Sequence, residues 1–103
     1  MEEQKKNMLS LIQPTNTPHL GNYLGAMQNW VKLQNDYNCY FGIADLHSIT
    51  VRQDPVKLRN QIKESYALLI AAGLDPEKST LFEQGHNPNH AELSWILSCY
   101  TQF

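Results

Sequence analysis

The residues with the clearest chemical potential lie between a predicted strand and a predicted helix. The stretch SLIQPTNTPHLGN, positions 10–22, places in one polar loop Gln13, His19, Gly21 and Asn22. Unpaired N–H groups at the start of a helix carry partial positive charge, so such a loop suits an anion. Gly21 lets a flat ring or a phosphate approach the backbone, and His19 offers a donor to charge developing on a phosphoryl group. The loop therefore predicts a nucleotide site, although a plain helix cap beside a surface histidine fits the same pattern.

The elements that must position this loop alternate between strand and helix. Apolar runs with little charge predict strands over residues 8–12, 38–45 and 79–85. Helical spacing of apolar residues, with asparagine or aspartate caps before the prolines of the last two, predicts helices over residues 20–36, 54–73 and 87–103. This order predicts an α/β protein with a three-layer, partial Rossmann-like fold, in which helices flank a short parallel sheet of about three strands.

A second polar segment follows the second predicted strand. Asp45 and His47 lie there, in a loop or a short helical turn. Ligands of parallel sheets bind beyond the C-terminal ends of the strands, so this turn and the loop after the first strand belong on one rim. Without a ligand, Asp45 serves equally well as a cap for the turn, and His47 as a partly buried histidine with its hydrogen bonds satisfied.

Composition narrows the class of protein. The chain has 103 residues, of which 42% are hydrophobic, and this favours one small folded domain. Its net charge is -2 and it has no block of basic residues, so we do not expect this segment to bind nucleic acid tightly by itself. Cys39 and Cys99 lie in apolar runs, which predicts buried free thiols in a reducing compartment. The apolar runs are too short to span a bilayer and the N-terminus does not read as a secretory signal, so we expect a soluble cytoplasmic protein with no membrane partner.

Two pairs of residues have a plain structural interpretation beside a functional one. His86 and His90 have a spacing that binds zinc on a helix, but Pro88 lies between them and no third ligand is evident. We therefore expect solvated residues at a helix start and no tightly bound metal. Trp30 and Trp95 lie on helical stripes and are expected in the core or in an interface rather than under a stacked base.

Several ordered blocks of sequence resemble one protein family. The blocks are SLIQP with PHLGNYLGA, DYNCYFGIADLHSITVRQDP, GLDPEKSTLF and HNPNHAELSWILSCYTQF. They resemble class I aminoacyl-tRNA synthetases, and among these the bacterial tryptophanyl-tRNA synthetases. The resemblance covers residues 8–103 and implies the N-terminal half of a nucleotide-binding catalytic domain, preceded by a flexible segment over residues 1–7. It further implies a fragment or a minimised form of such an enzyme.

The resemblance implies a reaction and the residues that serve it. The family activates tryptophan with ATP to tryptophanyl-adenylate and transfers it to tRNA(Trp), the tRNA being a partner of the full-length enzymes. His19, Leu20, Gly21 and Asn22 correspond to the H-I-G-H signature, with Asn22 in place of its final histidine. His19 and Asn22 are then the implied catalytic residues, and Gln13 and Gly21 join them in binding ATP, which Mg²⁺ accompanies as part of the substrate. The implied tryptophan pocket consists of Leu9, Leu11, Asp45 and His47.

Three residues depart from the family pattern. Leu11 stands where glycine leaves room for substrate, Glu83 stands where an aliphatic residue is usual, and Gly85 stands where serine is expected. The side chain of Leu11 either overpacks a tight substrate site or fills an apolar hole. The charge of Glu83 on an edge strand protects the strand against aggregation. The second, lysine-rich signature and the anticodon-binding domain are also absent. We therefore expect weak or no activity from the isolated chain, with self-association or a missing C-terminal half as its partner.

Two other interpretations of the chain stay open at this point. It fits a catalytically silent interaction or structural module that uses the open face of a half-sheet. It also fits a small nucleotidyltransferase that shares the H-x-G-H signature, although the blocks downstream of the loop argue against this one.

Overall fold

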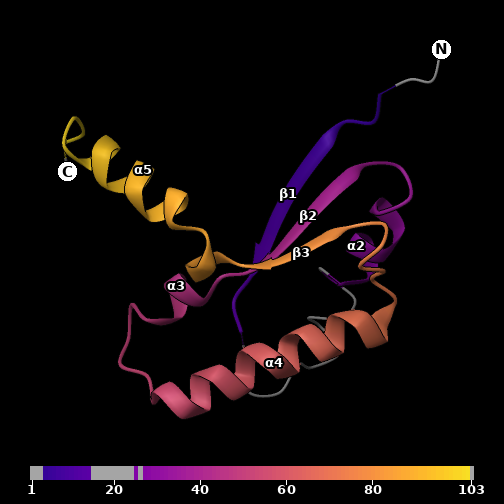
Figure 1. The fold of residues 1–103 in the computed structure, drawn as a ribbon, viewed down its shortest axis with the longest axis horizontal. Helices are drawn as coiled ribbons and strands as arrows, with labels where there is room; N and C mark the ends of the chain where they lie inside the picture. The colour runs from indigo at the N-terminus through magenta and orange to yellow at the C-terminus, as the bar shows by residue number, and fades with distance from the viewer. Residues whose placement is uncertain (1–3, 15–24, 26, 103) are drawn as a thin grey trace.

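The computed structural model describes residues 4–14, 25 and 27–102. Three parallel strands form one sheet in the order β1 (Asn7–Ile12), β2 (Asn38–Ile43) and β3 (Thr80–Glu83) (Figure 1). The predicted strands are confirmed, but β2 and β3 end two residues earlier than expected. After β2, Ala44 is irregular and Asp45 begins α3 (Asp45–Ser48); after β3, Gln84 and Gly85 belong to the 3₁₀ turn η2 (Gln84–His86).

The two longest helices begin as their sequences predict. In α4 (Pro55–Ala72), the carboxylate of Asp54 accepts a 3.0 Å hydrogen bond from the Val56 amide. In α5 (Pro88–Ser98), the side chain of Asn87 accepts a 3.2 Å bond from the Asn89 amide. Side-chain caps of this kind satisfy amides that have no partner within the first helical turn, and proline at the first position costs no hydrogen bond.

The predicted helix over residues 20–36 is described in part. Residues 20–24 and 26 lie outside the described residues, and α2 (Gln28–Leu33) ends before the expected Asp36. The reason is Gln34, whose buried amide donates to the Gly73 carbonyl at 2.9 Å and accepts from the Asp75 amide at 3.0 Å. The side chain of Gln34 thus ties the end of α2 to the end of α4.

The hydrophobic core lies on one face of the sheet, under α2 and α4. The ring of Trp30 stacks on Phe41, with centroids 4.3 Å apart, and Ile62 and Leu69 of α4 close the same cluster. Both crossovers pack here because the three strands follow one another in one direction and right-handed crossovers then fall on one side. The α/β fold class is confirmed, with Trp30 in the core as predicted.

The opposite face of the sheet is open among the described residues. Leu9 and Tyr40 are 57% and 41% exposed there. Helix α5 extends away from the sheet instead of covering this face, and its Trp95 is 73% exposed (Figure 1). Cys39 is a buried free thiol as predicted, but the prediction of a buried Cys99 is wrong, because this residue follows α5 and shares its exposure. No helix in the part of the chain that the structure describes is long and apolar enough to cross a membrane.

Candidate active site

The C-terminal ends of the three strands meet at one edge of the sheet. The last residues pair across it, Ile12 with Ile43 and Ile43 with Glu83, and the Ala44 amide donates to the Ile12 carbonyl at 2.7 Å. The segments that follow these strands therefore emerge side by side. Gln13 is exposed directly after β1, Asp45 opens α3 after β2, and η2 follows β3. This is the edge at which parallel sheets bind their ligands.

Asp45 connects two of these segments. Its Oδ1 atom accepts a 2.9 Å hydrogen bond from the Leu46 amide and a 2.7 Å bond from the Gly85 amide. A carboxylate that accepts two backbone amides is held in one orientation, because turning it leaves both donors without a partner. Asp45 thus fixes the start of α3 against the turn that follows β3.

Gly85 is matched to this carboxylate. A Cβ atom at Gly85 would lie 2.5 Å from Oδ2 of Asp45, closer than real Cβ atoms approach a neighbour. A serine, which the family resemblance leads us to expect here, therefore fits only if the carboxylate gives up its position. The glycine allows the close approach that the 2.7 Å hydrogen bond requires.

Glu83 brings a second carboxyl group to Asp45. Burial, the hydrogen bond to the Asp45 side chain and the Asp45 charge raise the pKa of Glu83, while nearby His86 opposes the shift. His86 Nε2 lies 3.3 Å from Oε2 of Glu83, whose side chain is 20% exposed. The phenol of Tyr66 in α4 faces the same group. Burial, then the charges of Glu83 and Asp45, raise its pKa to about 12, so Tyr66 stays neutral where the carboxyls are charged.

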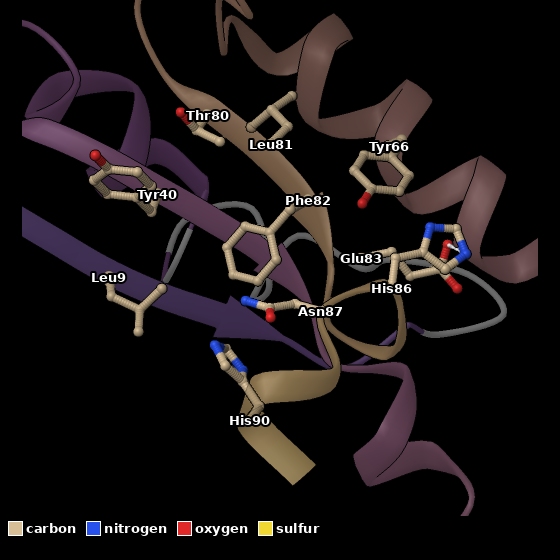
Figure 2. A pocket seen from close by; sticks show the side chains of 10 residues that line it. All are labelled: Leu9, Tyr40, Tyr66, Thr80, Leu81, Phe82, Glu83, His86, Asn87 and His90. Carbon is tan, nitrogen blue, oxygen red and sulfur yellow. Dashed lines mark ion pairs between the residues drawn. The ribbon is translucent and has the colours of Figure 1, made fainter. Parts of the chain in front are cut away.

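A cavity of about 760 Å³ surrounds the free edge of β3. Figure 2 shows Tyr66, Glu83 and His86 on one side of the strand and Leu9, Tyr40 and Phe82 on the other. The side chains that line the cavity are thus mostly apolar along the open face of the sheet, whereas those beside α4 carry ionisable groups. Its lining comprises Leu9, Tyr40, Tyr66, Thr80, Leu81, Phe82, Glu83, His86, Asn87 and His90.

Of the four residues predicted for a tryptophan pocket, one lines this cavity and the other three lie outside its lining. Leu9 lines the cavity. Leu11 follows on the same face and pairs with Gly42, where an added Cβ would meet Cγ of Leu11 at 3.0 Å and Cζ of Phe82 at 2.7 Å. Leu11 and Phe82 therefore occupy the space over Gly42. Asp45 is turned toward Gly85, and His47 is exposed on α3.

The predicted nucleotide loop is described only at its start. Gln13 follows β1 at the expected edge. His19, Leu20, Gly21 and Asn22 lie outside the described residues.

Sequence reasoning missed the contribution of the third strand. His86 and His90 were expected as solvated residues at a helix start, yet both line the cavity, and Tyr66 and Asn87 line it with them. The signal that could have found them is the rule already used for the first two strands, since residues after β3 emerge at the same edge. His86 and His90 lie in different elements, and the described residues hold no group of three possible metal ligands.

Comparison with known proteins identifies the family of the chain. The family model described as tRNA synthetases class I (W and Y) matches residues 1–103. The chain is 55% identical over 101 residues to the tryptophan–tRNA ligase of Clostridium tetani, covering 98% of this chain. It is 54% identical over 97 residues to that of Rickettsia bellii, covering 94%. The chain spans 30% of the length of each of these relatives.

Solved structures agree with the sequence comparison. The tryptophanyl-tRNA synthetase of Mycoplasma pneumoniae matches with a TM-score of 0.91 and 36% identity, over 96% of this chain and 29% of the other. The enzyme from Campylobacter jejuni, complexed with ADP and tryptophan, matches with a TM-score of 0.87 and 34% identity, over 93% of this chain and 30% of the other. The Rossmann-like fold and the predicted family resemblance are thereby confirmed, and the chain belongs to the class I tRNA synthetases of the W and Y group.

Proposed function

We propose that this chain supplies the ATP site and the tryptophan site of a tryptophan–tRNA ligase. The observation that carries the proposal is the 55% identity to a tryptophan–tRNA ligase over 101 residues. Because the chain spans 30% of that relative, we assign to the chain itself only the activation of tryptophan. Transfer to tRNA(Trp), with the tRNA as a partner, is proposed for the whole ligase.

The activation step calls for positioning rather than for a covalent intermediate on the protein. A carboxylate oxygen of tryptophan attacks the α-phosphorus of ATP in line, the bond to the bridging oxygen breaks, and pyrophosphate leaves with the electron pair. Mg²⁺ accompanies ATP and neutralises phosphate charge. We assign Gln13, His19, Gly21 and Asn22 to ATP binding. His19 and Asn22 donate hydrogen bonds to charge that develops on the phosphoryl group.

The tryptophan site is assigned to the open face of the sheet and to the start of α3. Leu9 and Leu11 present apolar surface beside the cavity, as an indole requires. Asp45 and His47 bound the site from α3, with Asp45 held by the Gly85 amide. We assign the amino acid to the space beside Gln13 at the end of β1, because in-line attack requires the two substrates to lie side by side.

Tryptophan-dependent exchange of pyrophosphate into ATP tests this function. We expect weak exchange that requires both substrates, falls about 100-fold or more in His19→Ala and falls in Asn22→Ala. Asn60→Ala, which changes an exposed asparagine on α4, is the matched control and keeps the parent rate. Exchange without tryptophan would support the small nucleotidyltransferase instead, and the absence of exchange contradicts the activation step.

A second candidate function is an interaction module that pairs with another copy of the chain. The observation that favours it is the exposure of large apolar side chains on α5, where Leu93, Trp95 and Leu97 are exposed by 57%, 73% and 56%. Sedimentation velocity tests it. A dimer that Trp95→Ser and Leu97→Ser dissociate supports the module, and a monomer at all concentrations contradicts it.

A further inference from the structure

One row of residues across the open face of the sheet has no side chain at its centre. Leu11 of β1, Gly42 of β2 and Phe82 of β3 are register partners across the three strands. A Cβ atom at Gly42 would lie 3.0 Å from both Cγ and Cδ2 of Leu11 and 2.7 Å from Cζ of Phe82. The two large side chains therefore meet in the space that Gly42 leaves free.

The side chain of Leu11 leans across the sheet to reach this space. Neighbouring strands lie about 4.8 Å apart, and a side chain perpendicular to the sheet keeps about that distance from the side chain beside it. The distance of 3.0 Å between Cγ of Leu11 and the Cβ position of Gly42 is much shorter. The branched end of Leu11 thus lies over β2 and projects less from the open face than an upright leucine would.

Phe82 approaches the same space from β3 and has little room to withdraw. Its ring meets the ring of His90 in α5 edge to face, with centroids 6.1 Å apart and an interplanar angle of 86° (Figure 2). Leu11 lies instead on the face that is open among the described residues, where Leu9 is 57% exposed. An atom added at Gly42 is therefore accommodated by rotation of Leu11 away from β2 and out over the open face.

We propose that Gly42 is a positioning residue that holds Leu11 back from the surface assigned to the indole of tryptophan, and so sets the size of the proposed tryptophan site. Leu11 stands where the family pattern has glycine, and it narrows the site. Gly42 offsets part of this narrowing because it receives the leucine side chain on the neighbouring strand. The inference rests on the proposed function, since the site in question is the one assigned there to tryptophan.

Gly42→Ala tests the proposal, with tryptophan affinity measured by titration calorimetry. The added methyl group displaces Leu11 toward the site, and we expect the affinity to fall about tenfold, the effect of one misplaced carbon in an apolar pocket. The affinity for ATP with Mg²⁺ is expected to stay at the parent value, which a general loss of folding would not allow. Gly25→Ala is the matched control and keeps both affinities, since a Cβ atom at Gly25 meets nothing within 4 Å.

The Leu11→Ala background separates an effect through Leu11 from a direct effect of the new methyl group. With no leucine to displace, Gly42→Ala is expected to leave the tryptophan affinity of Leu11→Ala unchanged. A loss of the same size in both backgrounds overturns the proposal, because Gly42 would then act without Leu11. An unchanged tryptophan affinity in Gly42→Ala alone overturns it as well.

Nuclear Overhauser contacts in the ¹³C-labelled parent chain test the geometry without any variant. We expect contacts from a Leu11 methyl group to the Hα atoms of Gly42 and to the ring of Phe82. Their absence shows that Leu11 does not lie over Gly42, and it overturns the proposal even if Gly42→Ala does not fold. If these contacts are present and no variant binds tryptophan, the proposed tryptophan site fails, whereas the placement of Leu11 by Gly42 is supported.

Discussion

The carboxylate of Asp45 accepts a 2.7 Å hydrogen bond from the amide of Gly85, 40 residues further along the chain. This bond ties the helix after β2 to the turn after β3, and it is possible because Gly85 has no side chain to displace Oδ2 of Asp45. The glycine and the aspartate are therefore one structural unit. A change at either residue acts on both segments at the C-terminal edge of the sheet.

Gly85→Ser is expected to destabilise the chain by about 1–3 kcal/mol, as overpacked sites do. The new Cβ would lie 2.5 Å from Oδ2 of Asp45, and the carboxylate moves only by losing its two amide donors. Urea unfolding measures the loss. The control is Gly25→Ala, since a Cβ at Gly25 meets nothing within 4 Å, and this change is neutral or stabilising. An equal cost of Gly85→Ser in an Asp45→Ala background would show that the clash with Asp45 is not the cause.

Leu11→Ala is expected to lower stability and to open the proposed tryptophan site. Leu11 and Phe82 share the space over Gly42, so truncation removes buried contacts at a cost of about 1–3 kcal/mol. It also removes the side chain that narrows the site, and we expect tryptophan affinity to rise about tenfold in titration calorimetry. Leu9→Ala is the control on the same face, where 57% exposure predicts a loss of less than about 1 kcal/mol. Unchanged or weaker binding in Leu11→Ala contradicts a blocking role.

The order and type of the elements could be predicted because they depend on local sequence. The Asp54–Pro55 and Asn87–Pro88 pairs predict where α4 and α5 begin, and both helices begin there in the structure. The ends of the strands were harder to predict from the sequence. The sequence continues apolar past Ile43, and only the pairing of β2 with its neighbours decides that the ladder ends before Asp45.

The candidate site was predictable where it follows the general rule for parallel sheets, and not where it depends on pairs of distant side chains. Asp45 was identified from its place after β2. Its hydrogen bond with the Gly85 amide depends on a contact between η2 and α3. These segments are 40 residues apart, and this contact cannot be read from a single sequence. Gly85 was noted as a departure from the family pattern, and its close contact with Asp45 gives that observation a physical basis.

Tyr66 is expected to make stability fall at alkaline pH. Its pKa is raised from 10.0 to about 12 in the folded chain, so the stabilisation is complete below pH 10 and is lost as the pH rises toward 12. The free energy of unfolding in urea, measured across this range, should decline less steeply in Tyr66→Phe than in the parent. Tyr100→Phe removes an 87% exposed phenol and serves as the control. Equal slopes for the parent and Tyr66→Phe would contradict the assignment.

Titration of the ¹⁵N-labelled chain with ATP and Mg²⁺, observed at the amides of Gly21 and Asn22, tests the central claim most directly. The account predicts that both amides shift and saturate at millimolar nucleotide, that His19→Ala weakens the response, and that the amide of Asn60 on α4 stays in place. Unchanged Gly21 and Asn22 resonances at millimolar ATP would contradict a nucleotide site in this chain.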